Sequence, residues 1–203
     1  MPGVRPAPDL VARDFNPPAP NRLWAADLTE IRTWEGTLYL AAIIDCYSRR
    51  CVGWAMAEHM RAELVVEALE MAVFQRKPDP GLIRHSDQGS QFTALIFGQR
   101  CHQAGIDRSM GARGCALDNA VCEAFFASLK KEKLNRRAWP TRQAARNAVF
   151  AWIEGWYNRR RLHSTLGYLS PADYENRTLI DGGTSLAASR LAPTSEMIKE
   201  KAA

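Results

Sequence analysis

Three short runs of β-prone residues between residues 23 and 57 constrain the fold more than any other feature of the sequence. Trp, Ile, Val, Leu, Tyr and Thr recur in Leu23–Thr33, Thr37–Asp45 and Cys51–Ala57, and these residue types favour strands. Glu35-Gly36 and the segment 48–50 separate the runs and have the composition of hairpin turns. The middle run is apolar on both faces. The sequence therefore predicts an antiparallel meander whose middle strand is central.

Downstream of the meander, helices and strands are expected to alternate. Apolar residues recur at spacings of three and four over residues 61–77, which is the period of an amphipathic helix, and Pro78 follows. The further expected elements are a strand at 82–85, a helix at about 93–104, a strand at 106–110 and two helices at roughly 119–134 and 141–157. This order predicts an α/β fold with a mixed sheet and helices on its faces.

The two ends of the chain differ from its middle. Residues 1–21 contain six of the eleven prolines, which exclude regular helix and paired strand, so we expect a proline-rich extended arm there. After Tyr174 the periodic pattern weakens, and residues 181–189 are small, polar and rich in glycine. We expect a single domain over 22–175, ending in a basic helical extension, and a mobile tail over 176–203.

Positive charge is concentrated in one part of the chain. The formal net charge is +5 and the pI is about 9.1, which indicates an anionic partner without naming it. Residues 124–161 contain ten basic and two acidic residues, so this segment alone carries +8. A scattered set of charges would be a solvated helix face. Clustering of this density favours contacts with phosphate.

The cysteines and the hydropathy pattern restrict the compartment. The five cysteines are odd in number and form no C-x-x-C pair, which favours reduced, intracellular thiols. Their spacing relative to His102 fits no standard zinc site. The sequence contains neither a signal peptide nor a run of 18 apolar residues, so we expect a cytoplasmic protein with no membrane partner.

Two aspartates follow or interrupt the predicted strands in positions that suggest chemistry. Asp27 lies within the apolar run Trp24–Thr29, where an acid costs stability unless it is paired or binds metal. Asp87 follows the short strand 82–85, where an aspartate could simply brace a turn. Asp45 also follows a strand, and its position alone leaves it open as a ligand, although we interpret it as a turn residue.

A third acid, Glu123, lies near the start of a predicted helix. At 100° per residue, Asn119, Glu123 and Lys130 fall within an arc of about 40°, while Val121, Cys122, Phe125 and Leu129 cluster on another side. The helix therefore presents a polar stripe beside its buried face.

Asp118 is suitably placed to cap this helix, and a capping role explains this acid without any part in catalysis. Phosphodiester cleavage needs divalent ions held by carboxylates from separate parts of a fold.

The spacing of these residues, and the words around them, resemble a known family. There are 35 residues between Asp87 and Glu123, and Lys130 follows Glu123 by seven, as in the DD(35)E insertion-sequence transposases and retroviral-type integrases. The matching words are HSDQGSQF (His85–Phe92), DNAVCEAFFASLK (Asp118–Lys130), YNRRRLH (Tyr157–His163), GYLSP (Gly167–Pro171), PNRLW (Pro20–Trp24) and Gly53-Trp54. The agreement extends over about residues 15–175.

The resemblance implies a fold and an activity. The fold would be ribonuclease-H-like, an α/β fold with a five-stranded mixed sheet and helices on both faces. Asp27, chosen over Asp45 by the resemblance, would join Asp87 and Glu123 in holding two magnesium ions, with manganese able to substitute. The chain would be the catalytic core of a DNA transposase or integrase that cleaves transposon ends and joins them to target DNA by phosphoryl transfer.

The resemblance also implies partners. Lys130 would contact DNA beside the site, as would Asn119. Arg113 lies in a glycine-containing segment that could border the DNA, and the run Arg159–Arg161 would contact backbone phosphate. The protein would act as a homo-oligomer on DNA in the bacterial cytoplasm, associated with the nucleoid, and would depend on an upstream helix-turn-helix protein or a fused first reading frame. Two alternatives stay open: an inactive or truncated DNA-binding remnant, and a ribonuclease-type nuclease without strand transfer.

Overall fold

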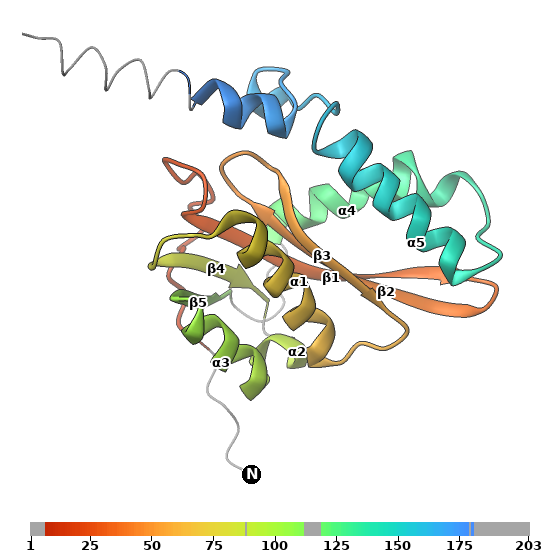
Figure 1. The fold of residues 1–203 in the computed structure, drawn as a ribbon, viewed down its shortest axis with the longest axis horizontal. Coiled ribbons are helices and arrows are strands. Elements are labelled where there is room, and N and C mark those ends of the chain that lie inside the picture. The colour runs from red at the N-terminus through yellow and green to blue at the C-terminus, as the bar shows by residue number, and fades with distance from the viewer. Residues whose placement is uncertain (1–6, 88, 112–118, 179, 181–203) are drawn as a thin grey trace, which may run out of the picture.

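The fold is centred on a five-stranded mixed sheet (Figure 1). The computed structural model describes residues 7–87, 89–111, 119–178 and 180. The strand order is β3-β2-β1-β4-β5, in which β1, β2 and β3 form the antiparallel meander and β4 and β5 run parallel to β1. The strands are β1 (Leu23–Thr33), β2 (Gly36–Asp45), β3 (Cys51–Ala57), β4 (Leu82–Ser86) and β5 (Ile106–Met110). The predicted mixed sheet, with β2 between two antiparallel neighbours, is confirmed.

Helices cover both faces of the sheet, as predicted (Figure 1). One face carries α1 (Ala62–Arg76), α2 (Ser90–Thr93) and α3 (Leu95–Gln103), and the other carries α4 (Ala120–Glu132) and α5 (Arg142–Phe150). A π-helix (Ala151–Tyr157) continues α5, short 3-10 helices lie at Leu134–Arg136 and Ser164–Leu166, and residues 171–178 are helical. Thr141 starts α5, because its hydroxyl accepts a hydrogen bond from the Ala144 amide at 3.0 Å.

Alternation along the strands supplies both cores. Successive side chains of a strand point to opposite faces, so Trp24 packs under α1 and α3 while Ala25 packs under α4 and α5. The same division separates Ile43 from Ile44 in β2. All four of these residues are buried, which accounts for the apolar character of the middle run on both faces.

Helix α1 lies unusually close to β3, and one glycine makes this possible. A Cβ added to Gly53 would lie 2.3 Å from the carbonyl oxygen of Ala68 and 2.7 Å from the Cβ of Ala72. Both atoms belong to buried residues of α1, which cannot move aside without displacing the helix. Gly53 therefore sets the distance between the meander and the helix that covers it.

The N-terminal segment contains neither helix nor strand over residues 7–22, yet it is held against the sheet. The Leu10 amide donates to the Ser109 hydroxyl at 2.9 Å, and the Met110 amide donates to the Pro8 carbonyl at 3.3 Å. Val11 is buried in the core under α4. The arm thus forms part of the α4 side of the molecule.

Two local expectations need correction. The helix expected over 93–104 is divided at Ala94, whose ψ of 142° is extended, so that α2 and α3 are separate. The helix expected over 141–157 changes to π-helix at Ala151. The wider turn alters the register of the face, so Trp152 is buried while Trp156 is 46% exposed and donates to Glu132.

The C-terminal part of the described chain is helical, and the described cysteines are buried. The helix over residues 171–178 crosses the boundary expected at residue 175, and residues 181–203 lie outside the described residues. Within the described residues, four cysteines are buried and unpaired, while Cys115 lies outside them. No helix of the described chain is both long and apolar enough to cross a membrane.

Candidate active site

Asp27 lies in the central strand and faces the α4 side of the sheet. Its odd-numbered neighbours Ala25 and Ile31 belong to the core under α4 and α5, and alternation places Asp27 on the same face. The side chain is half-buried, and one carboxylate oxygen accepts a hydrogen bond from the Leu28 amide at 2.7 Å. An acid at this depth costs free energy unless a cation or further donors compensate it.

Asp87 comes level with Asp27 through the pairing of two parallel strands. Leu23 pairs with Ile83 and Ala25 with His85, so partners in β1 and β4 differ by 60 in residue number. The same offset, carried two residues further, brings Asp87 beside Asp27 and onto the same face. Asp87 is exposed, and the amide of Gly89 donates to its carboxylate at 3.1 Å.

Glu123 reaches the same region from the helix above the sheet. It lies in the first turn of α4 and is exposed, while its neighbours Cys122, Phe125 and Leu129 are buried against the sheet. The burial of these neighbours fixes the rotation of α4 and therefore the direction of Glu123. The predicted helix register is present: an exposed acid stands beside a buried apolar face.

Electrostatics indicates that Asp87 and Glu123 lie close enough to Asp27 for their charges to act on it. Burial raises the pKa of Asp27 to about 6. The Leu28 amide opposes this rise, the negative charges of Asp87 and Glu123 add to it, and the positive charge of Arg84 offsets part of it. Asp27 is thus under the influence of both other acids, which come from a neighbouring strand and from a helix more than 30 residues later.

The three carboxylates suit a hard divalent cation, although their side chains do not converge around a single point. Carboxylate oxygens are the ligands that magnesium prefers, and a cation between these acids would relieve the repulsion that raises the pKa of Asp27. Among the described residues, no three acidic, histidine or cysteine side chains converge closely enough to hold one ion. The three acids therefore fit magnesium by their chemistry and their shared face.

The residues expected to contact DNA from α4 occupy different environments. Asn119 is the N-cap residue of α4 and is buried, and its amide oxygen has no hydrogen-bond partner among the described residues. Lys130 is half-buried and lines a groove of about 500 Å³ with Glu30 and Trp139. Seven residues of helix place it about 10 Å along α4 from Glu123. Arg113 lies outside the described residues, as does Asp118, the expected cap.

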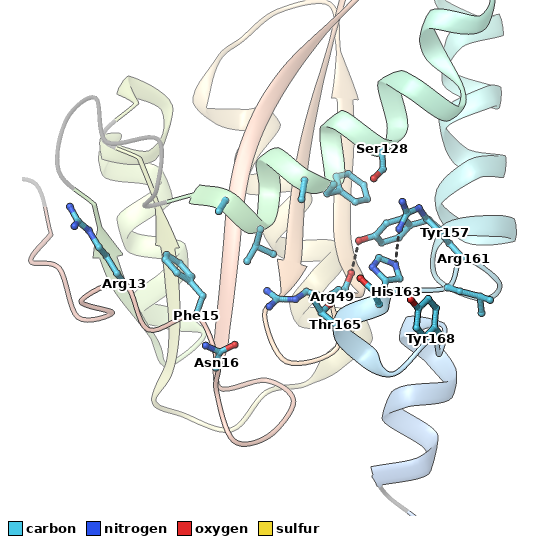
Figure 2. A pocket seen from close by; sticks show the side chains of 16 residues that line it. Arg13, Phe15, Asn16, Arg49, Ser128, Tyr157, Arg161, His163, Thr165 and Tyr168 are labelled. Atoms are coloured by element: carbon cyan, nitrogen blue, oxygen red, sulfur yellow. Dashed lines mark hydrogen bonds between the residues drawn. The ribbon is translucent and has the colours of Figure 1, made fainter.

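The three arginines that follow the π-helix differ in their exposure and in their partners. Arg159 and Arg160 are exposed, whereas Arg161 is half-buried and its Nε donates to Glu132 at 2.8 Å. Arg161 also lines a cavity together with His163 (Figure 2). The three arginines therefore differ in their availability to DNA.

Asp45, the competing acid, is a structural residue. It is fully buried, and its carboxylate accepts hydrogen bonds from the Asn21 amide, the Tyr47 amide and the Trp24 indole at 2.8, 2.9 and 3.3 Å. The Arg76 guanidinium lies 3.7 Å away. The bond to Tyr47 braces the turn after β2, as expected of a turn residue.

Sequence reasoning missed Arg84, a charged residue inside the short strand β4. Its guanidinium is fully buried, stacks on the rings of Phe92 and Phe97 at 4.2 and 4.6 Å, and donates to the Ser86 hydroxyl at 3.0 Å. Burial lowers the pKa of Arg84 to about 10. The sequence signal that could have identified this residue is a charged side chain in the middle of an apolar strand. The positive charge of Arg84 acts on Asp27 and offsets part of the rise in its pKa.

Comparison with known proteins gives one consistent result. Two sequence models described as "Integrase core domain" match residues 17–115 and 104–171. The transposase of insertion sequence element IS904 from Lactococcus lactis is 44% identical over 168 residues, covering 83% of this chain and 66% of the relative. The InsF transposase of insertion sequence IS3A from Escherichia coli is 41% identical over 177 residues, covering 87% of this chain and 62% of the relative. The chain thus spans somewhat less than two thirds of these relatives' length.

Solved structures agree on the fold. One chain of the simian T-cell lymphotropic virus intasome, in complex with a PP2A regulatory subunit, matches with a TM-score of 0.65 at 14% identity, covering 86% of this chain and 60% of that one. The HTLV-2 integrase catalytic core in complex with magnesium matches with a TM-score of 0.57 at 16% identity, covering 78% of this chain and 98% of that one. At these identities the likeness establishes the ribonuclease-H-like fold alone.

Proposed function

The chain belongs to the integrase core domain family of insertion-sequence transposases, and from that membership we propose that it cleaves transposon DNA ends and transfers them to target DNA. The observation that supports the proposal is the placement of Asp27 and Asp87 side by side by the pairing of β1 with β4, with Glu123 of α4 close enough for its charge to act on Asp27. Three acids from separate elements on one face of the sheet are what phosphoryl transfer between nucleic acid strands requires.

The proposed roles of the three acids follow from their positions. Asp27, Asp87 and Glu123 would hold two magnesium ions, or manganese in their place, and these would neutralise charge on the phosphate during transfer. Asp27 lies in the central strand, and its carboxylate accepts a hydrogen bond from the Leu28 amide. Glu123 is exposed in the first turn of α4, so it can adjust when the ions and DNA arrive.

The DNA is proposed to lie along α4 and the segment after the π-helix. Asn119 and Lys130 lie at the two ends of the stripe that carries Glu123, and the exposed Arg159 and Arg160 add positive charge. Arg113 and Arg161 complete the proposed set of contacts. These cations would bind backbone phosphate and position the strand, without reading its sequence.

Assembly and end recognition are proposed on the strength of the family. One of the matching structures is an intasome and another is a trimeric catalytic core, which supports a homo-oligomer on DNA. Choice of the cognate ends would come from an upstream helix-turn-helix segment or a first reading frame. The protein would act in the bacterial cytoplasm at the nucleoid.

A strand-transfer assay separates this proposal from its two alternatives. A labelled, pre-cleaved DNA end is incubated with the protein, magnesium and a target plasmid. The proposal expects joined products with the wild type and none with Glu123→Gln. A ribonuclease-type nuclease would cut without joining, and an inactive remnant would bind DNA without either reaction, so both of these results contradict the proposal.

A further inference from the structure

A cavity of about 630 Å³ lies next to the first turns of α4 (Figure 2), and none of the three acids lines it. It is bounded by the N-terminal arm, by the turn between β2 and β3, by α4 and by the segment 157–168, so its walls come from four distant parts of the sequence. Helix α4 contributes Ala120, Val121 and Ala124, the neighbours of Glu123. We call this cavity the arginine pocket, because its walls include Arg13, Arg49 and Arg161.

The charges around the arginine pocket are of one sign. None of its described lining residues is acidic. The guanidinium of Arg49 makes no hydrogen bond or ion pair with another described residue, while Arg161 is anchored from behind by Glu132. Burial and the charges of Arg161 and Arg49 lower the pKa of His163 to about 4, with Glu132 opposing them. The pocket thus has uncompensated positive charge and a neutral imidazole, which favours an anion.

Backbone strain is concentrated at this pocket. Of the six described non-glycine residues with positive φ, three line it: Arg13 at 65°, Arg49 at 61° and Tyr168 at 58°. Hydrogen bonds maintain the strained turns. The Tyr157 hydroxyl donates to the Arg49 carbonyl at 2.9 Å, and the Tyr168 amide donates to the His163 carbonyl at 2.9 Å. Strain that is held in this way is typical of functional sites.

Aromatic side chains provide a second kind of contact. Tyr168 is 70% exposed although it lies at the rim of the cavity, and nothing in the core depends on its ring. Tyr157 is buried, with its ring edge-on to His163 at 5.1 Å, and it supports the wall. A cation without an acidic partner among the described residues, Arg49, lies beside an exposed aromatic ring, and this is a combination with which proteins bind unpaired nucleotides.

We propose that the arginine pocket holds one unpaired nucleotide of the DNA strand near the three acids, with its phosphate bound by Arg49 and Arg161 and its base against Tyr168. The inference rests on the proposed function, since it assumes a DNA substrate. A cavity of this volume suits one small ligand and not a duplex. Binding the phosphate of a duplex requires only a cation on the surface. It would use neither the strained turns that shape the cavity nor the exposed ring of Tyr168.

Binding of a short single-stranded oligonucleotide with a central 2-aminopurine tests the proposal. The full chain is titrated without metal, so that no cleavage occurs, and both affinity and 2-aminopurine fluorescence are measured. Tyr168→Leu is expected to weaken binding about tenfold and to abolish the quenching caused by stacking. Arg49→Gln is expected to weaken binding about tenfold and to keep the quenching at saturation.

Matched controls lie on the opposite face of the sheet. Arg100→Gln removes an exposed arginine of α3, and Phe74→Leu removes an exposed aromatic ring of α1. Both should bind the oligonucleotide as the wild type does. Unchanged affinity in the pocket variants, equal losses in the controls, or equal binding and Tyr168 dependence with a duplex of the same length would each overturn the proposal. Circular dichroism checks that every variant is folded.

The failure of this inference can be told apart from failure of the proposed function. The two readouts are separate, because oligonucleotide binding without metal reports on the pocket and strand transfer with magnesium reports on the three acids. If strand transfer depends on Glu123 while Arg49 and Tyr168 do not affect binding, only the pocket is wrong. If Glu123→Gln transfers strands normally while the pocket variants lose binding, the triad assignment is wrong and the pocket stands.

Discussion

Two groups of acidic residues in this molecule differ in whether nearby cations compensate their charge. At the end of β2, Asp45 and Glu175 are buried against the half-buried side chains of Arg76 and Arg50, and we call these four residues the Arg76 cluster. Arg76 donates two hydrogen bonds of 2.8 Å to the Glu175 carboxylate, and Arg50 adds a third at 2.8 Å. Burial alone would raise the pKa of Glu175, but these bonds and charges outweigh it and lower that pKa below its usual value.

Among the residues that the structure describes, the candidate active site contains three acids and no comparable cation. Asp27 is half-buried with one amide donor, Asp87 and Glu123 are exposed, and the pKa of Asp27 is raised to about 6. Arg84 opposes this rise only weakly, as the last of the contributions. The Arg76 cluster joins the C-terminal helix to the sheet, whereas the three acids keep negative charge uncompensated. Acids in this state are suited to bind an external cation, which is the role that we propose for them.

The largest effect on stability is expected from breaking the Arg76 cluster. Arg76→Gln would leave the Glu175 carboxylate buried without its bidentate partner, and removing one member of a buried pair costs about 3 kcal/mol. Urea denaturation should show this loss. Arg100→Gln is the control, because it breaks the exposed pair with Glu70, where about 0.5 kcal/mol or less is expected. Similar small losses in both variants would contradict the structural role of the cluster.

A change of opposite sign is expected at Asp27. At pH 7 in metal-free buffer, Asp27→Asn should increase the free energy of unfolding by about 1–2 kcal/mol, because it removes a carboxylate whose charged form is disfavoured. The pKa is raised, so the gain should shrink as the pH falls from 6 to 4 and the native carboxylate takes up its proton. Denaturation at several pH values provides the measurement.

The exposed Asp107 of β5 offers a matched control for this substitution. Asp107→Asn should leave the free energy of unfolding within about 0.5 kcal/mol of the wild type. Magnesium should also stabilise the wild type and Asp107→Asn, and stabilise Asp27→Asn less. A loss of stability in Asp27→Asn would mean that its carboxylate is compensated, and that the contrast with the Arg76 cluster is wrong.

The same reasoning applies to His163 with the sign of the charge reversed. Its pKa is lowered to about 4 by burial and by Arg161 and Arg49, so between pH 6.5 and 4 the unfolded chain takes up a proton that the native imidazole does not. Stability should therefore fall as the pH is lowered through this window. His163→Gln should make that fall shallower by about 1 kcal/mol, after allowance for solvent screening. An unchanged slope would show that the cations around the arginine pocket are already compensated.

The sequence predicted the elements well because their signals are local. The strands at 23–33, 51–57 and 106–110 have the predicted bounds, and α1 is within one residue at each end. Alternation and the period of 3.6 residues act over one or two turns of chain, so a single sequence contains them. The register of α4 was predicted for the same reason, since Glu123 is exposed beside buried Cys122 and Phe125.

Features that depend on distant parts of the chain could not be predicted in the same way. The pairing of β1 with β4 brings Asp87 beside Asp27, and no local pattern predicts that offset; the choice of these two acids rested on the family resemblance. The burial of Arg84 depends on the rings of Phe92 and Phe97 folding over it. The arginine pocket combines residues 13, 49 and 168, whose positive φ angles leave no mark in composition or spacing.

Magnesium-dependent nicking of a labelled DNA end tests the central claim most directly. The wild type, Glu123→Gln and Glu67→Gln are compared at equal concentrations of folded protein, with Glu67 as an exposed glutamate of α1 on the opposite face of the sheet. The wild type and Glu67→Gln should nick at the same rate, and Glu123→Gln should show no nicking above background. Equal activity in the wild type and Glu123→Gln would contradict the claim that the three uncompensated acids form the active site.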